Sequence, residues 1–92
     1  YEPDFVYTTQ SKTVYIEAKG RFRTSEEARK YVIIAETLSS KEELVFLFQR
    51  AKTPMPGSRR RKDGTRYTME EWAEKHGFRW YTLDTIPTGW RR

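Results

Sequence analysis

The sequence predicts an α/β (α+β) fold, with a mixed central β-sheet flanked by helices and elements in the order β-β-α-β-loop-α-β. Two observations carry this prediction. Short runs rich in β-branched and aromatic residues are typical of strands, and they alternate with two segments that open with a capping-box pattern and continue with helical spacing. The chain has 92 residues, a length that supports one hydrophobic core, so we expect a single domain over 1–92.

A strand hairpin is expected at the start of the chain. The runs Phe5–Tyr7 and Val14–Ile16 flank a short polar connector, which predicts two antiparallel strands. Thr24 then precedes Glu27 at capping-box spacing, and apolar residues recur at helical intervals, which predicts a helix over 25–38. Three adjacent apolar residues within it predict a wide helix face buried against the sheet.

The second half of the chain predicts a buried strand, a long loop, a short helix and a last strand. Leu44–Phe48 lacks polar alternation, which indicates a central strand buried on both faces. The segment 49–66 contains prolines and glycines without apolar periodicity and is expected to form a loop. A second capping box begins at Thr68 and predicts a helix that ends before Gly77, with a strand following at 78–82.

Basic residues are concentrated in the segment 49–66, called the basic loop below. The formal net charge is +5, and seven of the 18 Lys and Arg residues lie in this segment against one acidic residue. These seven are Arg50, Lys52, Arg59, Arg60, Arg61, Lys62 and Arg66. Because the rest of the chain is nearly neutral, the surplus predicts a localised contact with a polyanion. A solvated loop or a localisation signal is the alternative interpretation.

The composition excludes several classes of protein. The chain has no cysteine and a single histidine, which excludes a disulfide framework, a thiolate zinc site and a histidine-rich metal cluster. The longest apolar run is Leu44–Phe48, far shorter than the roughly 20 residues that span a bilayer, so we expect no membrane insertion. The chain opens at Tyr1 without a leader pattern, which favours a cytoplasmic protein and a fragment or processed chain.

Two carboxylates and a lysine form the clearest candidate site. Pro3-Asp4 is followed, thirteen residues after Asp4, by Glu17-Ala18-Lys19, which is the form of the PD-(D/E)xK motif of nucleases. Hydrolysis of a phosphodiester requires hard oxygen ligands for Mg²⁺, and Asp4 and Glu17 are suitable ligands. Lys19 can position or deprotonate the attacking water, or stabilise the charge that develops on the phosphate.

Strand geometry predicts that these groups meet. Alternate side chains of a strand share a face, so Glu17 and Lys19 project together while Ala18 points the other way. The hairpin returns the second strand beside the first, which brings Asp4 to the same end of the sheet. Glu2 is a further acidic candidate, but as a near neighbour of Asp4 it is expected to point to the opposite face. The alternative interpretation is that the motif arose by chance and that Glu17 and Lys19 form an ordinary solvent-exposed pair.

Further segments extend the pattern over nearly the whole chain. They are Tyr1-Glu2-Pro3-Asp4-Phe5, Tyr15-Ile16-Glu17-Ala18-Lys19-Gly20, Glu74-Lys75-His76-Gly77, and Ile86-Pro87 followed by Trp90. Together they resemble the phage-type endonuclease I family, the Holliday-junction resolvases of the PD-(D/E)xK superfamily. The resemblance implies a restriction-endonuclease-like core in which Asp4 and Glu17 bind Mg²⁺ or Mn²⁺. It also implies that the Ala18 carbonyl completes the coordination and that Lys19 assists the water.

The start of the chain departs from this family. Family members carry an N-terminal segment with a helix that supplies another catalytic Glu and with a strand exchanged between subunits, whereas this sequence starts after both. We therefore expect a homodimer if that segment exists. A phage-encoded member would act in the cytoplasm of the host cell.

These observations predict a Mg²⁺-dependent endodeoxyribonuclease that acts on branched (four-way junction) or distorted DNA. Asp4, Glu17 and Lys19 are the expected catalytic residues. Arg21 and Arg23 follow Lys19 and are expected to contact phosphates together with the seven basic-loop residues. Two alternatives remain open, a nucleic-acid-binding module without catalysis and a catalytic half that needs a missing N-terminal segment or a partner.

Overall fold

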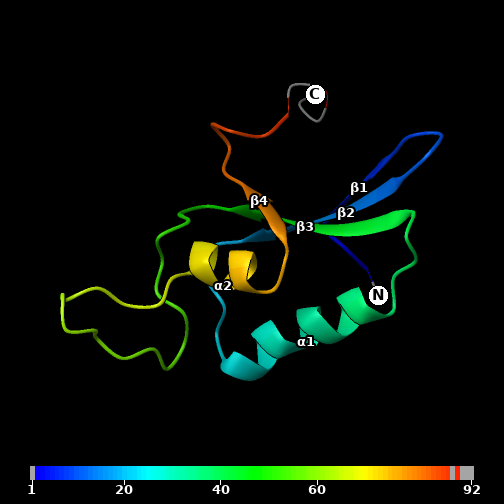
Figure 1. Ribbon diagram of the computed structural model, residues 1–92. Helices are drawn as coiled ribbons and strands as arrows, with labels where there is room; N and C mark the ends of the chain where they lie inside the picture. Colours follow the sequence, from blue (N-terminus) through cyan, green and yellow to red (C-terminus); the bar gives the residue numbers. More distant parts are fainter. Residues whose placement is uncertain (1, 88, 90–92) are drawn as a thin grey trace.

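The computed structural model describes residues 2–87 and 89 (Figure 1). Its elements are β1 (Phe5–Thr8), β2 (Thr13–Lys19), α1 (Ser25–Glu36), β3 (Glu42–Phe48), α2 (Met69–Lys75) and β4 (Arg79–Tyr81). The fold is α+β, with a mixed four-stranded sheet and two helices in the expected order along the chain. Trp90, which contributes to the resemblance described above, lies outside the described residues.

The sheet has the strand order β1-β2-β3-β4. β1 pairs antiparallel with β2, and Phe5 lies opposite Ile16. β2 pairs parallel with β3, and β3 pairs parallel with β4, so each helix is a crossover between parallel strands. The carboxyl ends of β2, β3 and β4 therefore meet at one edge of the sheet. β3 is an interior strand, as predicted, and its residues Val45 and Phe46 are fully buried on opposite faces.

Both helices cover the same face of the sheet (Figure 1). The main core forms between them and the sheet from Phe22, Ala28, Tyr31, Leu44, Phe46, Phe48, Met55, Met69, Trp72, Ala73 and Phe78. A smaller apolar cluster lies on the other face of the sheet. It comprises Val14, Ile16 and Val45, packed with Tyr7, Leu47 and Tyr81. The segment after β4 also reaches this face. Among the described residues, the helices are too short and too polar to cross a membrane.

α1 begins where the capping pattern predicts, because Thr24 Oγ1 accepts a hydrogen bond from the Glu27 N–H at 3.1 Å. The prediction of a wide buried face holds in part, because Val32, Ile34 and Ala35 pack partly buried against the main core, but it is wrong for Ile33. Ala28 and Tyr31 are the buried residues of α1, whereas Ile33 is 55% exposed. The large ring of Tyr31 fills the space against the sheet, and Ile33 lies two residues further on, on the far side of the helix.

A backbone hydrogen bond closes the base of the basic loop just before α2 begins. The predicted capping box at Thr68 is present, and Gly77 follows α2 with a φ of 78°, a value that glycine adopts without strain. The Met55 N–H donates to the Tyr67 carbonyl at 2.8 Å, and Met55 is buried in the main core. The loop is therefore attached to the core near its start and its end.

Candidate active site

The β1–β2 hairpin brings Asp4 to Glu17. Phe5 pairs with Ile16, so the next opposed positions are Asp4 and Glu17. The Asp4 carboxylate reaches β2, because its Oδ2 accepts a hydrogen bond from the Ala18 N–H at 2.9 Å. Asp4, Glu17, Ala18 and Lys19 border one cavity of about 650 Å³ and are called the Asp4–Lys19 cluster below. These are the four residues that sequence analysis grouped as catalytic or metal-binding.

The backbone of β2 directs the Ala18 carbonyl toward the β1 side of the strand. The Lys19 carbonyl accepts a hydrogen bond from the Gln49 N–H at 3.0 Å, so the peptide groups of Lys19 face β3. Successive residues of a strand face opposite neighbours, and the Ala18 N–H and carbonyl therefore face the β1 side. Continuing the register places Pro3 opposite Ala18, and proline has no N–H to offer this carbonyl.

The donor set fits a hard divalent cation. The Asp4 and Glu17 carboxylates and the Ala18 carbonyl supply the oxygen ligands that Mg²⁺ and Mn²⁺ prefer. Within residues 2–87 and 89, no group of three or more His, Cys, Asp or Glu side chains is placed to hold a metal ion. The carboxylates of such a site would therefore be those of Asp4 and Glu17, with the backbone and water completing it.

Glu17 is the buried member of the cluster. It is 5% exposed, and its Oε2 accepts a hydrogen bond from the Tyr31 hydroxyl at 3.3 Å. A buried carboxylate requires such donors, because loss of water otherwise costs several kcal/mol. α1 supplies this donor by turning Tyr31 toward β2.

Lys19 is held between a carboxylate and an aromatic ring. Its Nζ lies 3.4 Å from Glu27 Oε2 and 4.9 Å from the centroid of the Tyr31 ring. Partial burial lowers the pKa of Lys19, but the Tyr31 hydroxyl and the Glu27 carboxylate more than offset this, so the pKa lies above its ordinary value. Lys19 is therefore an ammonium at neutral pH, which suits it to orienting a water or stabilising negative charge.

α1 contributes residues that sequence analysis missed as site residues. Lys30, Tyr31 and Ile34 border the cavity, and Glu27 pairs with Lys19. These four residues have the i, i+3, i+4, i+7 spacing of one helix face, which was visible in the sequence. The sequence does not show which face of the helix turns toward β2.

The expectation for Glu2 is wrong. Glu2 borders the same cavity as Asp4 instead of pointing to the opposite face. Residues two apart in an extended segment lie on the same face, so Glu2 is expected on the side of Asp4, just as Glu17 and Lys19 share a face. Glu2 is exposed, and it adds negative charge at the rim of the cavity.

All nine predicted DNA-binding residues are exposed, but they occupy two places. Arg21 and Arg23 follow β2, and Arg50 and Lys52 follow β3, so these four lie near the sheet edge where Lys19 ends its strand. The other five are Arg59, Arg60, Arg61, Lys62 and Arg66, farther along the basic loop. In the described chain, the residues bordering the Asp4–Lys19 cavity include none from 49–66.

The distal part of the basic loop has its own turn. The Arg61 N–H donates to the Thr65 carbonyl at 2.7 Å, and Gly64 adopts a φ of 85° within this turn. Arg61 also pairs with Glu71 of α2, with 2.8 Å between Nη2 and Oε2. This ion pair lowers the pKa of Glu71 and raises that of Arg61. One of the predicted DNA-binding cations is thus already opposite a carboxylate.

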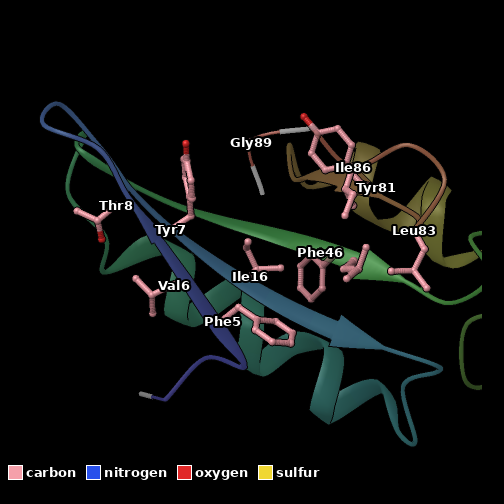
Figure 2. Close-up of a pocket in the computed structure, with 11 residues that line it drawn as sticks. Phe5, Val6, Tyr7, Thr8, Ile16, Phe46, Tyr81, Leu83, Ile86 and Gly89 are labelled. Atoms are coloured by element: carbon pink, nitrogen blue, oxygen red, sulfur yellow. The ribbon is translucent and has the colours of Figure 1, made fainter. Parts of the chain in front are cut away.

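A larger cavity of about 770 Å³ is associated with the other apolar cluster (Figure 2). Residues of β1, such as Phe5 and Tyr7, line one side, and Leu83 and Ile86 after β4 line the other (Figure 2). The described residues that line it include no charged side chain. This hollow therefore offers nothing for phosphodiester chemistry, unlike the Asp4–Lys19 cluster.

The fold and the site define an α+β protein with three carboxylates and two lysines at one cavity beside a parallel strand pair. No protein-family model matches the chain, and no curated protein matches its sequence. The functional interpretation rests on the Asp4–Lys19 cluster and the distribution of basic residues.

Proposed function

We propose that the protein is a Mg²⁺- or Mn²⁺-dependent endodeoxyribonuclease of the PD-(D/E)xK type. The observation that supports this most is the contact between Asp4 Oδ2 and the Ala18 N–H, because it joins the Pro-Asp segment to the Glu-x-Lys strand. The three motif residues, the carboxylates of Asp4 and Glu17 and the ammonium of Lys19, then border one cavity. A solvated Glu/Lys pair would not be expected to bury its glutamate to 5% exposure.

The proposed chemistry assigns a role to each residue of the cluster. Asp4, Glu17 and the Ala18 carbonyl would hold the cation. The cation, when bound, offsets charge on the scissile phosphate and acidifies water. The Lys19 ammonium orients the attacking water or stabilises the charge of the transition state. Hydrolysis by water attack is proposed to leave a 5′-phosphate.

The proposed substrate is DNA, preferentially branched or distorted. Arg21, Arg23, Arg50 and Lys52 lie near the cluster and would contact phosphates beside the cut, while the distal basic loop would contact phosphates farther away. The preference for four-way junctions, the restriction-endonuclease-like core and a dimer built through an N-terminal segment come from the resemblance to the endonuclease I family. A cytoplasmic location belongs to the same proposal.

The test is Mg²⁺-dependent cleavage of a four-way junction and a plain duplex. We expect wild type to cut, and Asp4→Asn and Lys19→Ala each to lose about 100-fold or more in rate. Asp84→Asn is the matched control, because Asp84 is an exposed carboxylate in the turn after β4. Cleavage that persists in both cluster variants would end the proposed mechanism.

A second candidate is a nucleic-acid-binding module without catalysis. It is favoured by the distal basic loop, whose cations stand apart from the carboxylate cavity. Titration with Mn²⁺ separates the candidates, because a nuclease site binds the ion through Asp4 and Glu17 whereas a pure binder is indifferent to it. A catalytic half is the third candidate, and it predicts weak cleavage that rises when the upstream segment is added.

A further inference from the structure

We propose that Tyr31 of α1 is a positioning residue of the candidate site, which orients Glu17 for the cation and holds the Lys19 ammonium beside it. The inference rests on the proposed function and adds a residue that the PD-(D/E)xK pattern does not contain. Tyr31 lies fourteen residues after Glu17 in sequence, and its contacts with Glu17 and Lys19 exist because α1 packs across the end of β2.

The hydroxyl of Tyr31 acts on Glu17. It donates to Glu17 Oε2 at 3.3 Å, and both side chains are buried, with 4% and 5% exposure. This distance is longer than the roughly 2.8 Å of a strong O–H···O bond, so the contact offsets only part of the cost of burying Glu17, and its loss should lower stability only modestly. A donor on one carboxylate oxygen does, however, limit rotation of the carboxylate. Partners of metal ligands act in this way.

The ring of Tyr31 acts on two lysines. Lys19 Nζ lies 4.9 Å and Lys30 Nζ 5.2 Å from the ring centroid, both within range of a cation–π contact. The ring itself is fixed, because it packs against Phe22 at 6.0 Å and edge-on against Phe46 at 5.4 Å between centroids. A rigid ring on a helix therefore sets where the Lys19 ammonium stands relative to Glu17.

Tyr15 supplies a matched control. It lies on the same strand and the same face as Glu17, and its hydroxyl also donates to a carboxylate, Glu42 Oε2, at 2.5 Å. Glu42 begins β3, at the end of the strand pair away from the Asp4–Lys19 cluster. Removing either hydroxyl deletes one Tyr-to-Glu hydrogen bond, but Tyr31 is the tyrosine that contacts a proposed metal ligand.

The experiment measures Mn²⁺ affinity by calorimetry in the absence of DNA, together with the melting temperature of the metal-free protein. We expect Tyr31→Phe to weaken Mn²⁺ binding about 10-fold, the lower end of the effects seen for partners of metal ligands, while it melts near wild type. Tyr15→Phe should bind Mn²⁺ as wild type does. In a Glu17→Gln background, Tyr31→Phe should cause no further loss, because the hydroxyl acts through Glu17.

Each of the other outcomes would contradict either the positioning role of Tyr31 or the nuclease proposal itself. If wild type and Tyr31→Phe bind Mn²⁺ equally, and Asp4→Asn does not bind, the positioning role is wrong and the nuclease proposal stands. If wild type binds no Mn²⁺, both proposals fall. A Tyr31→Phe chain that loses its folded structure would also overturn the positioning role, because the hydroxyl would then be required for folding.

Discussion

The Asp4–Lys19 cluster and the basic loop differ in how their charged groups are held and in how far these groups are exposed to water. In the cluster, strand register and a helix fix each charged group, and the carboxylate of Glu17 and the ammonium of Lys19 are largely withdrawn from water. In the basic loop, the cations are exposed on irregular backbone, and core contact comes through Met55 and Ala51. Under the proposed function, the cluster holds a small ligand at a defined point, and the basic loop contacts a polyanion in several possible arrangements.

This difference separates two energetic terms. Rigid placement matters where chemistry depends on distances of a few ångström, so the groups of the cluster are held before any ligand arrives. Phosphate neutralisation requires only that cations be near the DNA backbone, and its strength depends on salt more than on geometry. The two regions should therefore respond independently to substitution, and three predictions test this, beginning with the largest expected effect.

Met55→Ala should have the largest effect, on stability. Met55 is 7% exposed and packs in the main core, so removal of its side chain should cost about 2–3 kcal/mol of unfolding free energy. Chemical denaturation measures this, with Lys52→Ala as an exposed control in the same loop. If the regions are independent, Mn²⁺ affinity under native conditions stays as in wild type. A parallel loss of Mn²⁺ binding would show that the loop supports the cluster.

The elements and part of the site were predictable because their determinants are local. Capping residues and apolar spacing located both helices, and the hairpin between Asp4 and Glu17 predicted that these two residues would meet. Strand alternation also placed Lys19 on the same face as Glu17. These predictions need information only from residues close in sequence, or from strands joined by a short turn.

The rest depends on packing between distant segments. Tyr31 reaches Glu17 because the ring packs on Phe22 and Phe46, which selects one face of α1 among several that are partly apolar. Likewise, the pairing of Arg61 with Glu71 depends on how the basic loop returns to α2. No periodicity specifies such contacts, since the first depends on which side chains fill the core and the second on the path of the loop.

Arg59→Ala and Arg61→Ala should differ in their effect on DNA affinity. Arg59 is exposed in the basic loop, and loss of one phosphate contact should weaken binding several-fold and reduce the slope of log affinity against log salt by about 1. Arg61 already faces the Glu71 carboxylate, so its removal should change both quantities less. Binding measured across a salt series in Ca²⁺ provides the comparison. Equal slopes for the two variants would mean that DNA displaces Glu71 from Arg61.

Glu27→Gln should have the smallest effect, which is measured on the pH dependence of stability. Partial burial opposes ionisation of Glu27, but the Arg23 N–H at 2.8 Å and the Lys19 ammonium favour it more, so the pKa of Glu27 lies below its ordinary value. The unfolded chain then binds more protons, and the stabilisation is complete above the unfolded pKa and lost as the pH falls from about 5 toward 3.

Melting curves across this pH range should therefore be less steep in pH for Glu27→Gln than for wild type, and the exposed Glu26→Gln serves as the control in the same helical turn. A wild-type pH dependence in Glu27→Gln would mean that the Lys19 contact contributes nothing to folding. The ammonium of Lys19 would then be held by the Tyr31 ring at 4.9 Å, and the cluster would owe its arrangement to the aromatic contact instead of the ion pair.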